Sequence, residues 1–306
     1  MPRVIECIPN FSEGRNHDVV DDIVGAIASV PRILLLRRES DADHNRSVVT
    51  FAGDAAAVEE AAFRGVARAV ALIDLTRHQG AHPRMGAADV VPFVPLDGAT
   101  MAECVESSHR VAERIWNECG VPVYYYEASA RVPEHRNLAD LRRGQFERIR
   151  DEIGAVPRRA PDVGLPRVHP TAGITAVGAR GPLIAFNVLL DTNDITVARA
   201  IARAVRFSSG GVPFIKALGF EIRSRDRVQV SMNLVNYLVT PIHVAFDAVR
   251  HEAETRGVGI LSTELIGLIP DDAMLAAAAH YLRMQEFSPS RVLENRLREA
   301  VADRDA

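Results

Sequence analysis

The chain has 306 residues, of which 47% are hydrophobic and 25% charged, so it is long enough to bury a large core in one or two domains. Its formal net charge of −4 argues against general binding to nucleic acid or to an anionic membrane. The start of the chain has no signal-peptide pattern, and no run of 18 apolar residues occurs. The three cysteines are odd in number and lack metal-ligand spacing, which favours reduced thiols. We therefore expect a soluble, cytoplasmic protein.

The first elements alternate between strand and helix. The apolar segment 4–8 predicts a strand, and the helical spacing of apolar residues over 18–30 predicts a helix that Pro31 ends. A buried strand is expected over Ile33–Leu36, followed by a polar cluster over 39–46. That cluster is either a solvated hairpin turn, the commoner case, or one wall of a site.

Local signals mark the next elements more clearly. They are a helix capped by Asp54 and ending near Leu75, a strand over 89–94, a helix opened by the capping-box pair Thr100 and Glu103 and closed by Gly120, and a strand over 121–126. Strands that are mostly separated by helices predict an α/β fold in which helices cover a sheet.

The segment 151–180 differs from the rest of the chain. It contains four prolines and four glycines and has no helical periodicity. Such a long irregular segment is typically functional or joins two domains. We place the domain boundary at its end, which gives an N-terminal domain over 1–180 and a C-terminal domain over 181–306. Its glycines match neither the dinucleotide pattern nor the P-loop pattern.

The second half repeats the coarse order strand, helix, strand, strand, helix, strand. It begins with an apolar strand over 183–190, and helices from about Asp271 and Pro289 follow the repeat. The alternation over Val228–Leu234 places Gln229, Ser231 and Asn233 on one polar face of a strand.

The loop His78–Leu96 holds the leading candidate for chemistry. Pro83 pushes His82 toward an extended backbone, and an imidazole can exchange protons near neutral pH, so His82 is a candidate general acid or base. The alternative is a histidine that only stabilises a tight turn. His78 and His82 also have the i, i+4 spacing of metal ligands on a helix, but Gly80 argues against a helix there, so we expect no metal.

Several segments taken together resemble the glutamate formimidoyltransferase family, the folate-dependent enzymes of histidine breakdown and one-carbon metabolism. The resemblance covers nearly the whole chain. The segments that carry it are Glu6-Cys-Ile-Pro-Asn-Phe-Ser-Glu-Gly-Arg15, the loop His78–Leu96, Gly178-Ala-Arg-Gly-Pro-Leu-Ile-Ala-Phe-Asn187, Ser208-Ser-Gly-Gly and Val228–Leu234.

The resemblance implies two similar α/β subdomains packed sheet to sheet with a ligand passage between them, and a homodimer. It implies that the chain transfers a formimidoyl group from N-formimidoyl-L-glutamate to N5 of tetrahydrofolate, its co-substrate, with His82 as the catalytic residue. The family's folate-binding segment falls on Val163, Gly164, Leu165, Pro166, Arg167, Val168, His169, Pro170, Thr171 and Ala172. Because the bifunctional animal members carry a further cyclodeaminase domain, for which 306 residues leave no room, only the transferase activity is expected.

Other residues are candidates to support this chemistry. The carboxylates of glutamate and folate require cations, and the candidates are Arg46, Arg84, Arg180 and Lys216. Asp89 or Glu39 is expected to orient the imidazole, and Asn10 and Asn45 lie in the polar loops nearby. Three alternatives stay open: a transferase that uses N-formyl-L-glutamate, a folate-binding protein without catalysis, and a metal-dependent hydrolase that uses His78 and His82.

Overall fold

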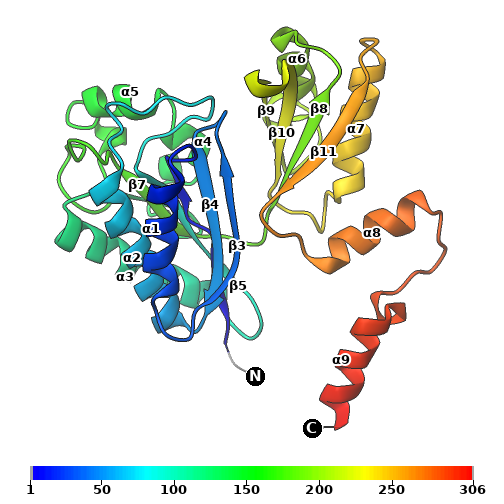
Figure 1. The fold of residues 1–306 in the computed structure, drawn as a ribbon, viewed down its shortest axis with the longest axis horizontal. Helices are drawn as coiled ribbons and strands as arrows, with labels where there is room; N and C mark the ends of the chain where they lie inside the picture. Colours follow the sequence, from blue (N-terminus) through cyan, green and yellow to red (C-terminus); the bar gives the residue numbers. More distant parts are fainter. Residues whose placement is uncertain (1–2, 305–306) are drawn as a thin grey trace. The chain divides into compact units, whose positions relative to one another are not determined.

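The computed structural model describes residues 3–304, and the chain divides into two compact units. The first unit runs to Pro182 and the second begins at Leu183. Each unit has its own sheet (Figure 1). Each also has its own hydrophobic core.

In the described part of the chain, the first unit contains a mixed seven-stranded sheet. Strand β4 pairs with the edge strand β3 on one side and with the short strands β1 and β2 on the other, and these two also pair with β5. Strand β7 lies between β5 and β6 and is parallel to both. The strands are β1 (Ile5–Cys7), β2 (Asn10–Phe11), β3 (Leu34–Asp41), β4 (Arg46–Gly53), β5 (Ala88–Pro95), β6 (Val123–Glu127) and β7 (Thr175–Ala179).

Helices cover both faces of this sheet. The long helices α1 (His17–Ala28), α2 (Ala55–Leu72) and α3 (Met101–Cys119) enclose the larger core on one face. A second core on the other face includes residues of α4 (Leu138–Leu141) and α5 (Gln145–Glu152). Short 3₁₀ turns lie at Pro133–His135 and Pro157–Arg159.

The predicted helix caps of this unit are confirmed. The Asp54 side chain accepts a hydrogen bond from the backbone N–H of Ala57, and Thr100 and Glu103 form the reciprocal capping box. Gly120 ends α3 with a φ of 66°, a conformation that glycine adopts without a steric penalty. These caps satisfy backbone groups at the helix ends.

One predicted strand lies at the edge of the sheet and not in its buried interior. The apolar run before residue 37 predicted a buried strand, but Leu34, Leu35 and Leu36 are 61%, 42% and 45% exposed in β3. The prediction of burial was wrong because β3 is at the edge of the sheet, where described helices leave its leucines uncovered.

The prediction of one long irregular segment over residues 151–180 was also wrong in part. Its last residues form β7, an interior strand of the first sheet, and its first residues complete α5. Only the stretch between them is irregular, and it belongs to the first unit.

The second unit has the predicted order of elements. Its antiparallel sheet runs β11-β8-β10-β9, with α6 and α7 packed on the apolar face. The predicted alternation over Val228–Leu234 is confirmed, because Val228, Val230, Met232 and Leu234 all lie in this core. The elements are β8 (Ile184–Leu190), α6 (Ile195–Val205), β9 (Ile215–Ile222), β10 (Arg227–Leu234), α7 (Ile242–Glu254), β11 (Ile260–Ile266), α8 (Asp271–Tyr281) and α9 (Leu293–Arg304), with 3₁₀ turns at Phe207–Ser209, Arg223–Arg225 and Pro289–Arg291.

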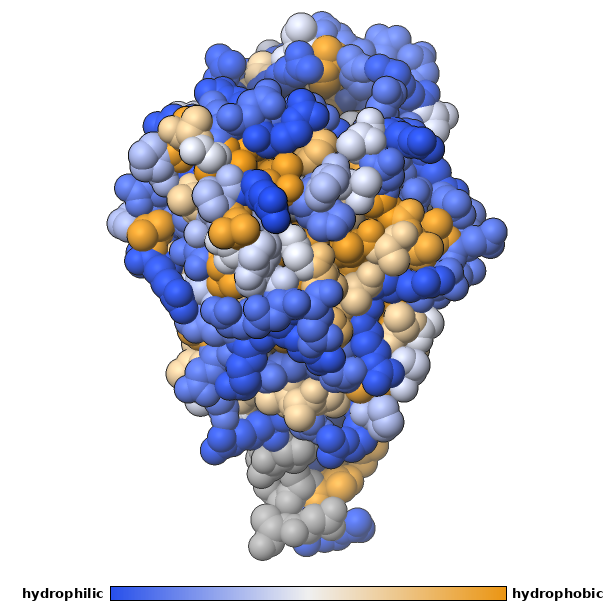
Figure 2. Space-filling view, turned by 90° about the vertical axis from the view of Figure 1, so that its left-hand side faces the viewer, coloured by the Kyte–Doolittle hydropathy of each residue, from blue (hydrophilic) through white to orange (hydrophobic). Residues whose placement is uncertain are grey.

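One face of the molecule is mostly polar. Figure 2 shows a largely hydrophilic face on which apolar residues form separate patches. None of the helices formed by residues 3–304 combines the length and the apolar character needed to span a bilayer.

Candidate active site

The loop between α2 and β5 places His82 at the surface of the first unit, where its residue is partly buried. This loop packs on the turn between β3 and β4. The backbone N–H of Ala81 donates to the carbonyl oxygen of Asp43 at 3.1 Å. A Cβ atom on Gly80 would lie 2.2 Å from the carbonyl oxygen of His44, so only glycine permits this approach. The backbone hydrogen bond of Ala81 and the close approach at Gly80 therefore hold the loop against this turn.

His82 Nδ1 has two close neighbours. It lies 2.6 Å from Nη1 of Arg46 and 2.7 Å from the carbonyl oxygen of Pro83. In a neutral ring Nδ1 either accepts from the guanidinium or donates to the carbonyl. The Nδ1–H tautomer puts the basic lone pair on Nε2, whereas the other tautomer makes Nε2 a donor. Whether the proton of the neutral ring is on Nδ1 or on Nε2 therefore decides whether Nε2 of His82 can act as a base.

Arg46 connects His82 to a buried carboxylate. Its Nε and Nη2 atoms donate to Oδ1 of Asn10 at 3.0 and 2.7 Å, and Nη1 donates to Oδ2 of Asp89 at 3.1 Å. The Asp89 side chain is 1% exposed, and its Oδ1 accepts the backbone N–H of Met85 at 2.8 Å. Arg142 lies on the other side of this carboxylate, with Nη2 2.5 Å from Oδ2.

These charges set the protonation of the site. Burial, then the neighbouring guanidinium of Arg46 and that of Arg142, lower the pKa of His82 well below its usual value. Burial and the charge of Arg142 lower the pKa of Arg46 to about 9, which keeps Arg46 charged at neutral pH. His82 is therefore neutral at pH 7, the state that a general base requires.

Two other predicted residues brace the loop. Asn45 accepts the backbone N–H of Gly14 and donates to the carbonyl oxygen of Gln79, each at 3.0 Å. The Arg84 side chain is 10% exposed and makes a two-bond ion pair with Glu147, at 2.6 and 2.8 Å.

His78 contacts the same residues. Its Nε2 atom lies 2.9 Å from the carbonyl oxygen of Asn45, and its Nδ1 accepts a hydrogen bond from Arg84. Within residues 3–304, no group of three or more histidine, cysteine, aspartate or glutamate side chains is arranged to hold a metal ion.

The remaining predicted residues are Glu39, Arg180 and Lys216. Glu39 is in β3 and accepts a hydrogen bond from Arg37. Arg180 follows β7, where its backbone N–H donates to Phe93 and its Nη1 to the carbonyl oxygen of Gly181. Lys216 is in β9 of the second unit.

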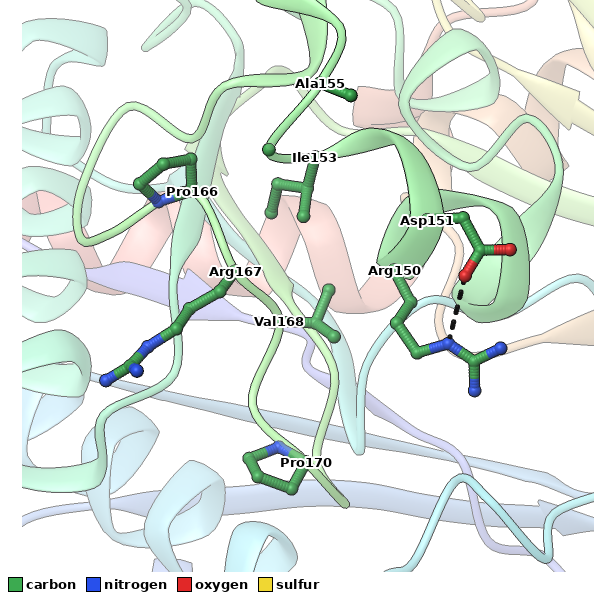
Figure 3. A pocket seen from close by; sticks show the side chains of 9 residues that line it. Arg150, Asp151, Ile153, Ala155, Pro166, Arg167, Val168 and Pro170 are labelled. Atoms are coloured by element: carbon green, nitrogen blue, oxygen red, sulfur yellow. Dashed lines mark hydrogen bonds and ion pairs between the residues drawn. The ribbon is translucent and has the colours of Figure 1, made fainter.

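The segment Val163–Ala172 lines a pocket of about 410 Å³ in the first unit. Pro166, Arg167, Val168 and Pro170 form one side, and the end of α5 with Ile153 and Ala155 forms the other (Figure 3). Figure 3 shows Arg150 and Arg167 on opposite sides of Val168, with Arg150 paired to Asp151 at 3.2 Å. The pocket thus combines apolar side chains with Arg167 and the Arg150–Asp151 pair, and volumes of this order hold small organic ligands.

The same segment is joined to the loop that carries His82. The backbone N–H of Ile174 donates to Met85 at 3.0 Å, and that of Ala87 donates to Ala172 at 2.9 Å. Gly173 has a φ of 71°, and a Cβ there would lie 2.2 Å from the carbonyl oxygen of Met85. Glycine is needed at this crossing, and it brings two segments that are distant in sequence into direct contact.

The structure adds two residues that the sequence did not indicate. Arg142 shares Asp89 with Arg46, and the ring of His44 lies 6.1 Å from that of His82 between centroids. Arg142 sits in an Arg-Arg pair within a polar stretch, which carries no signal that distinguishes the buried arginine from its exposed neighbour. His44 was part of the polar cluster over 39–46, which here turns beside the site rather than only into solvent.

Comparison with known proteins identifies the family. The model of the formiminotransferase domain, N-terminal subdomain, matches residues 4–180, and that of the formiminotransferase domain matches residues 185–303. A glutamate formimidoyltransferase of Streptococcus pyogenes is 48% identical over 97% of this chain and 99% of its own length, and one of Thermoplasma acidophilum is 42% identical over 97% and 98%. A formimidoyltransferase-cyclodeaminase of Gallus gallus is 38% identical over 94% of this chain, which spans about half (54%) of that relative. The chain belongs to the formiminotransferase family.

Proposed function

We propose that this protein is a glutamate formimidoyltransferase, which moves the formimidoyl group of N-formimidoyl-L-glutamate to N5 of tetrahydrofolate in the degradation of histidine to glutamate. The observation that carries the proposal is His82, an imidazole kept neutral by burial and by two guanidinium groups, in a chain whose relatives bear this name. A neutral imidazole at the surface of a braced loop is suited to take a proton from a reacting amine.

In the proposed reaction, N5 of tetrahydrofolate attacks the carbon of the formimidoyl group and forms a bond to it. The resulting tetrahedral intermediate carries an extra proton on N5, which Nε2 of His82 removes. This step requires the tautomer in which Nδ1–H donates to Pro83, at 2.7 Å. His82 then returns the proton to the glutamate nitrogen, the carbon–nitrogen bond breaks, and glutamate leaves as the amine. Proton transfer of this kind contributes roughly 10² to 10⁴ in rate.

The rest of the rate enhancement is assigned to positioning of the two substrates. The pocket beside Val163–Ala172 supports folate binding there, because Val168 and Ile153 offer apolar contact to a flat ring system and Arg150 and Arg167 offer cations to an anionic tail. The backbone contacts between Ile174 and Met85 support delivery of that ligand toward the His82 loop.

The proposal is tested with purified enzyme, both substrates and the variant His82→Ala. Turnover is expected to fall by about 10² to 10⁴, while tetrahydrofolate binding measured by calorimetry stays close to that of the unchanged protein. Retention of most of the turnover would remove the proposed role of His82. Turnover is also expected to survive treatment with a chelator, whereas a hydrolase using His78 and His82 as metal ligands would lose it.

The same assay compares donors. Faster turnover of N-formimidoyl-L-glutamate than of N-formyl-L-glutamate is expected, and the reverse would assign the chain to formyl transfer. Binding of tetrahydrofolate without turnover of either donor would identify a folate-binding protein that is not an enzyme.

The same proposal includes a cellular compartment and an oligomeric state for the protein. Reduced, mostly buried cysteines are compatible with a cytoplasmic enzyme of one-carbon metabolism. The family resemblance supports a homodimer, and a measured mass of twice 33.4 kDa in solution is the expected result.

A further inference from the structure

Arg142 is a mostly buried cation that pairs with Asp89. It follows α4, its side chain is 13% exposed, and its Nη2 lies 2.5 Å from Oδ2 of Asp89. Among the described residues, neither Nε nor Nη2 has a partner with hydrogen-bond geometry. Both atoms are enclosed by protein, so a ligand can reach only the part of the side chain that remains exposed.

The other two arginines near His82 are better satisfied. Arg46 donates to Asn10 and Asp89, and Arg84 makes a two-bond ion pair with Glu147. One carboxylate, Asp89, therefore serves both Arg46 and Arg142, and this group of three side chains carries an excess of one positive charge. That excess, next to an imidazole held neutral, favours an anionic group of a bound ligand.

The position of Arg142 is fixed by the backbone around it. Arg159, which is 7% exposed, donates to the carbonyl oxygens of Leu141 at 2.8 Å and Arg143 at 2.6 Å, on either side of Arg142 in the chain. The backbone N–H of Gln145 donates to the carbonyl oxygen of Arg142 at 2.8 Å. The guanidinium is thus presented by a rigid turn, as recognition of a small anion requires.

We propose that Arg142 binds the α-carboxylate of the glutamate half of the donor and so selects the donor. The inference rests on the proposed function. In N-formimidoyl-L-glutamate, only the glutamate nitrogen and Cα separate the α-carboxylate from the carbon that is transferred, whereas the γ-carboxylate lies two methylene groups further away. Arg142 shares Asp89 with Arg46, the residue in contact with His82, so it is placed to meet the carboxylate nearer the reacting carbon.

The test compares two donors, N-formimidoyl-L-glutamate and N-formimidoyl-4-aminobutyrate, which lacks only the α-carboxylate. The unchanged enzyme is expected to prefer the glutamate donor roughly 10- to 100-fold in kcat/KM, as a charge-assisted contact predicts. In Arg142→Met this preference is expected to collapse toward one. The matched control is Arg143→Met, the adjacent arginine, whose side chain is 71% exposed and which should keep the full preference.

Several results would overturn the assignment. A preference that persists in Arg142→Met means that the side chain does not contact the α-carboxylate. Loss of discrimination against N-formimidoyl-2-aminobutyrate, which lacks the γ-carboxylate, would move the contact to the other end of the donor. Should Arg142→Met fail to fold by circular dichroism, Arg142→Gln gives the same readout. If the unchanged enzyme turns over no formimidoyl donor, the proposed function itself fails, a result distinct from an unchanged preference.

Discussion

Nη1 of Arg46 lies 2.6 Å from Nδ1 of His82, so a guanidinium is in direct contact with the imidazole. A cation at this distance disfavours protonation of the ring, the opposite of the effect of a carboxylate partner. Arg46 is itself held by Asn10 and Asp89, which fixes the direction from which its charge acts.

The pH profile of the enzyme should reflect this contact. Because the pKa of His82 is lowered, kcat/KM is expected to hold as the pH falls through about 6.5 and to decline only at lower pH, where the imidazole gains a proton. Arg46→Gln removes the neighbouring charge, raises the pKa of His82 and should move the acid limb to higher pH. The control is Arg38→Gln, an arginine paired with Asp21 on the surface. Identical acid limbs in Arg46→Gln and the unchanged enzyme would contradict this account.

Asp89 is expected to be important for stability. Asp89→Asn keeps the shape of the side chain but leaves Arg46 and Arg142 without a buried counter-charge, at a cost of roughly 3 to 5 kcal/mol in the free energy of unfolding. Urea denaturation measures this cost. Asp140→Asn makes the same chemical change in a carboxylate that is 48% exposed and pairs with the exposed Arg143, and should cost about 1 kcal/mol or less. Equal losses in the two variants would argue against the buried charge balance.

The hydrogen bonds that Arg159 donates to the turn around Arg142 are expected to stabilise the protein. Arg159→Ala leaves the carbonyl oxygens of Leu141 and Arg143 without their donor, so a loss of roughly 2 to 5 kcal/mol in unfolding free energy is expected. The adjacent Arg158 is exposed, and Arg158→Ala should unfold at nearly the same urea concentration as the unchanged protein. A neutral result for Arg159→Ala would mean that the turn at Arg142 is held by other contacts.

Gly80 should control the position of His82. The added methyl group of Gly80→Ala would meet the carbonyl oxygen of His44 at 2.2 Å, and the loop must shift to relieve this contact. A displacement of about 1 Å at a reacting group can lower the rate by 10², so kcat is expected to fall by that order. Gly25→Ala in α1, where a methyl group meets nothing within 4 Å, serves as the control and should leave kcat unchanged. Unchanged kcat in both would show that the loop does not depend on this approach.

Local signals explain what could be predicted from the sequence. The caps at Asp54 and Thr100 depend on neighbouring residues only, as does the alternation over Val228–Leu234, and all were found as expected. The geometry around His82 follows in part from Gly80 and Pro83, which exclude a helix there. The family resemblance supplied the role of His82, which spacing alone left open.

Long-range pairing explains the features that could not be predicted from the sequence. Thr175–Ala179 gives a weak strand signal because it contains two alanines and a glycine. A Cβ on Gly178 would lie 2.3 Å from the carbonyl oxygen of Tyr126, so this glycine is what lets β7 fit beside β6. The ion pair between Asp89 and Arg142 joins a strand to a distant turn, and no local pattern encodes it. The exposure of Leu34–Leu36 depends on the edge position of β3, which follows from the topology of the whole sheet.

The late place of β7 in the chain has a consequence for synthesis. Strands β5 and β6 leave the ribosome well before the strand that pairs with both of them, so the growing chain carries two open strand edges until Ala179 has emerged. Non-local pairing of this kind folds slowly. A nascent polypeptide stalled upstream of Thr175 would therefore be prone to aggregate and a natural client for chaperones, however stable the finished enzyme is.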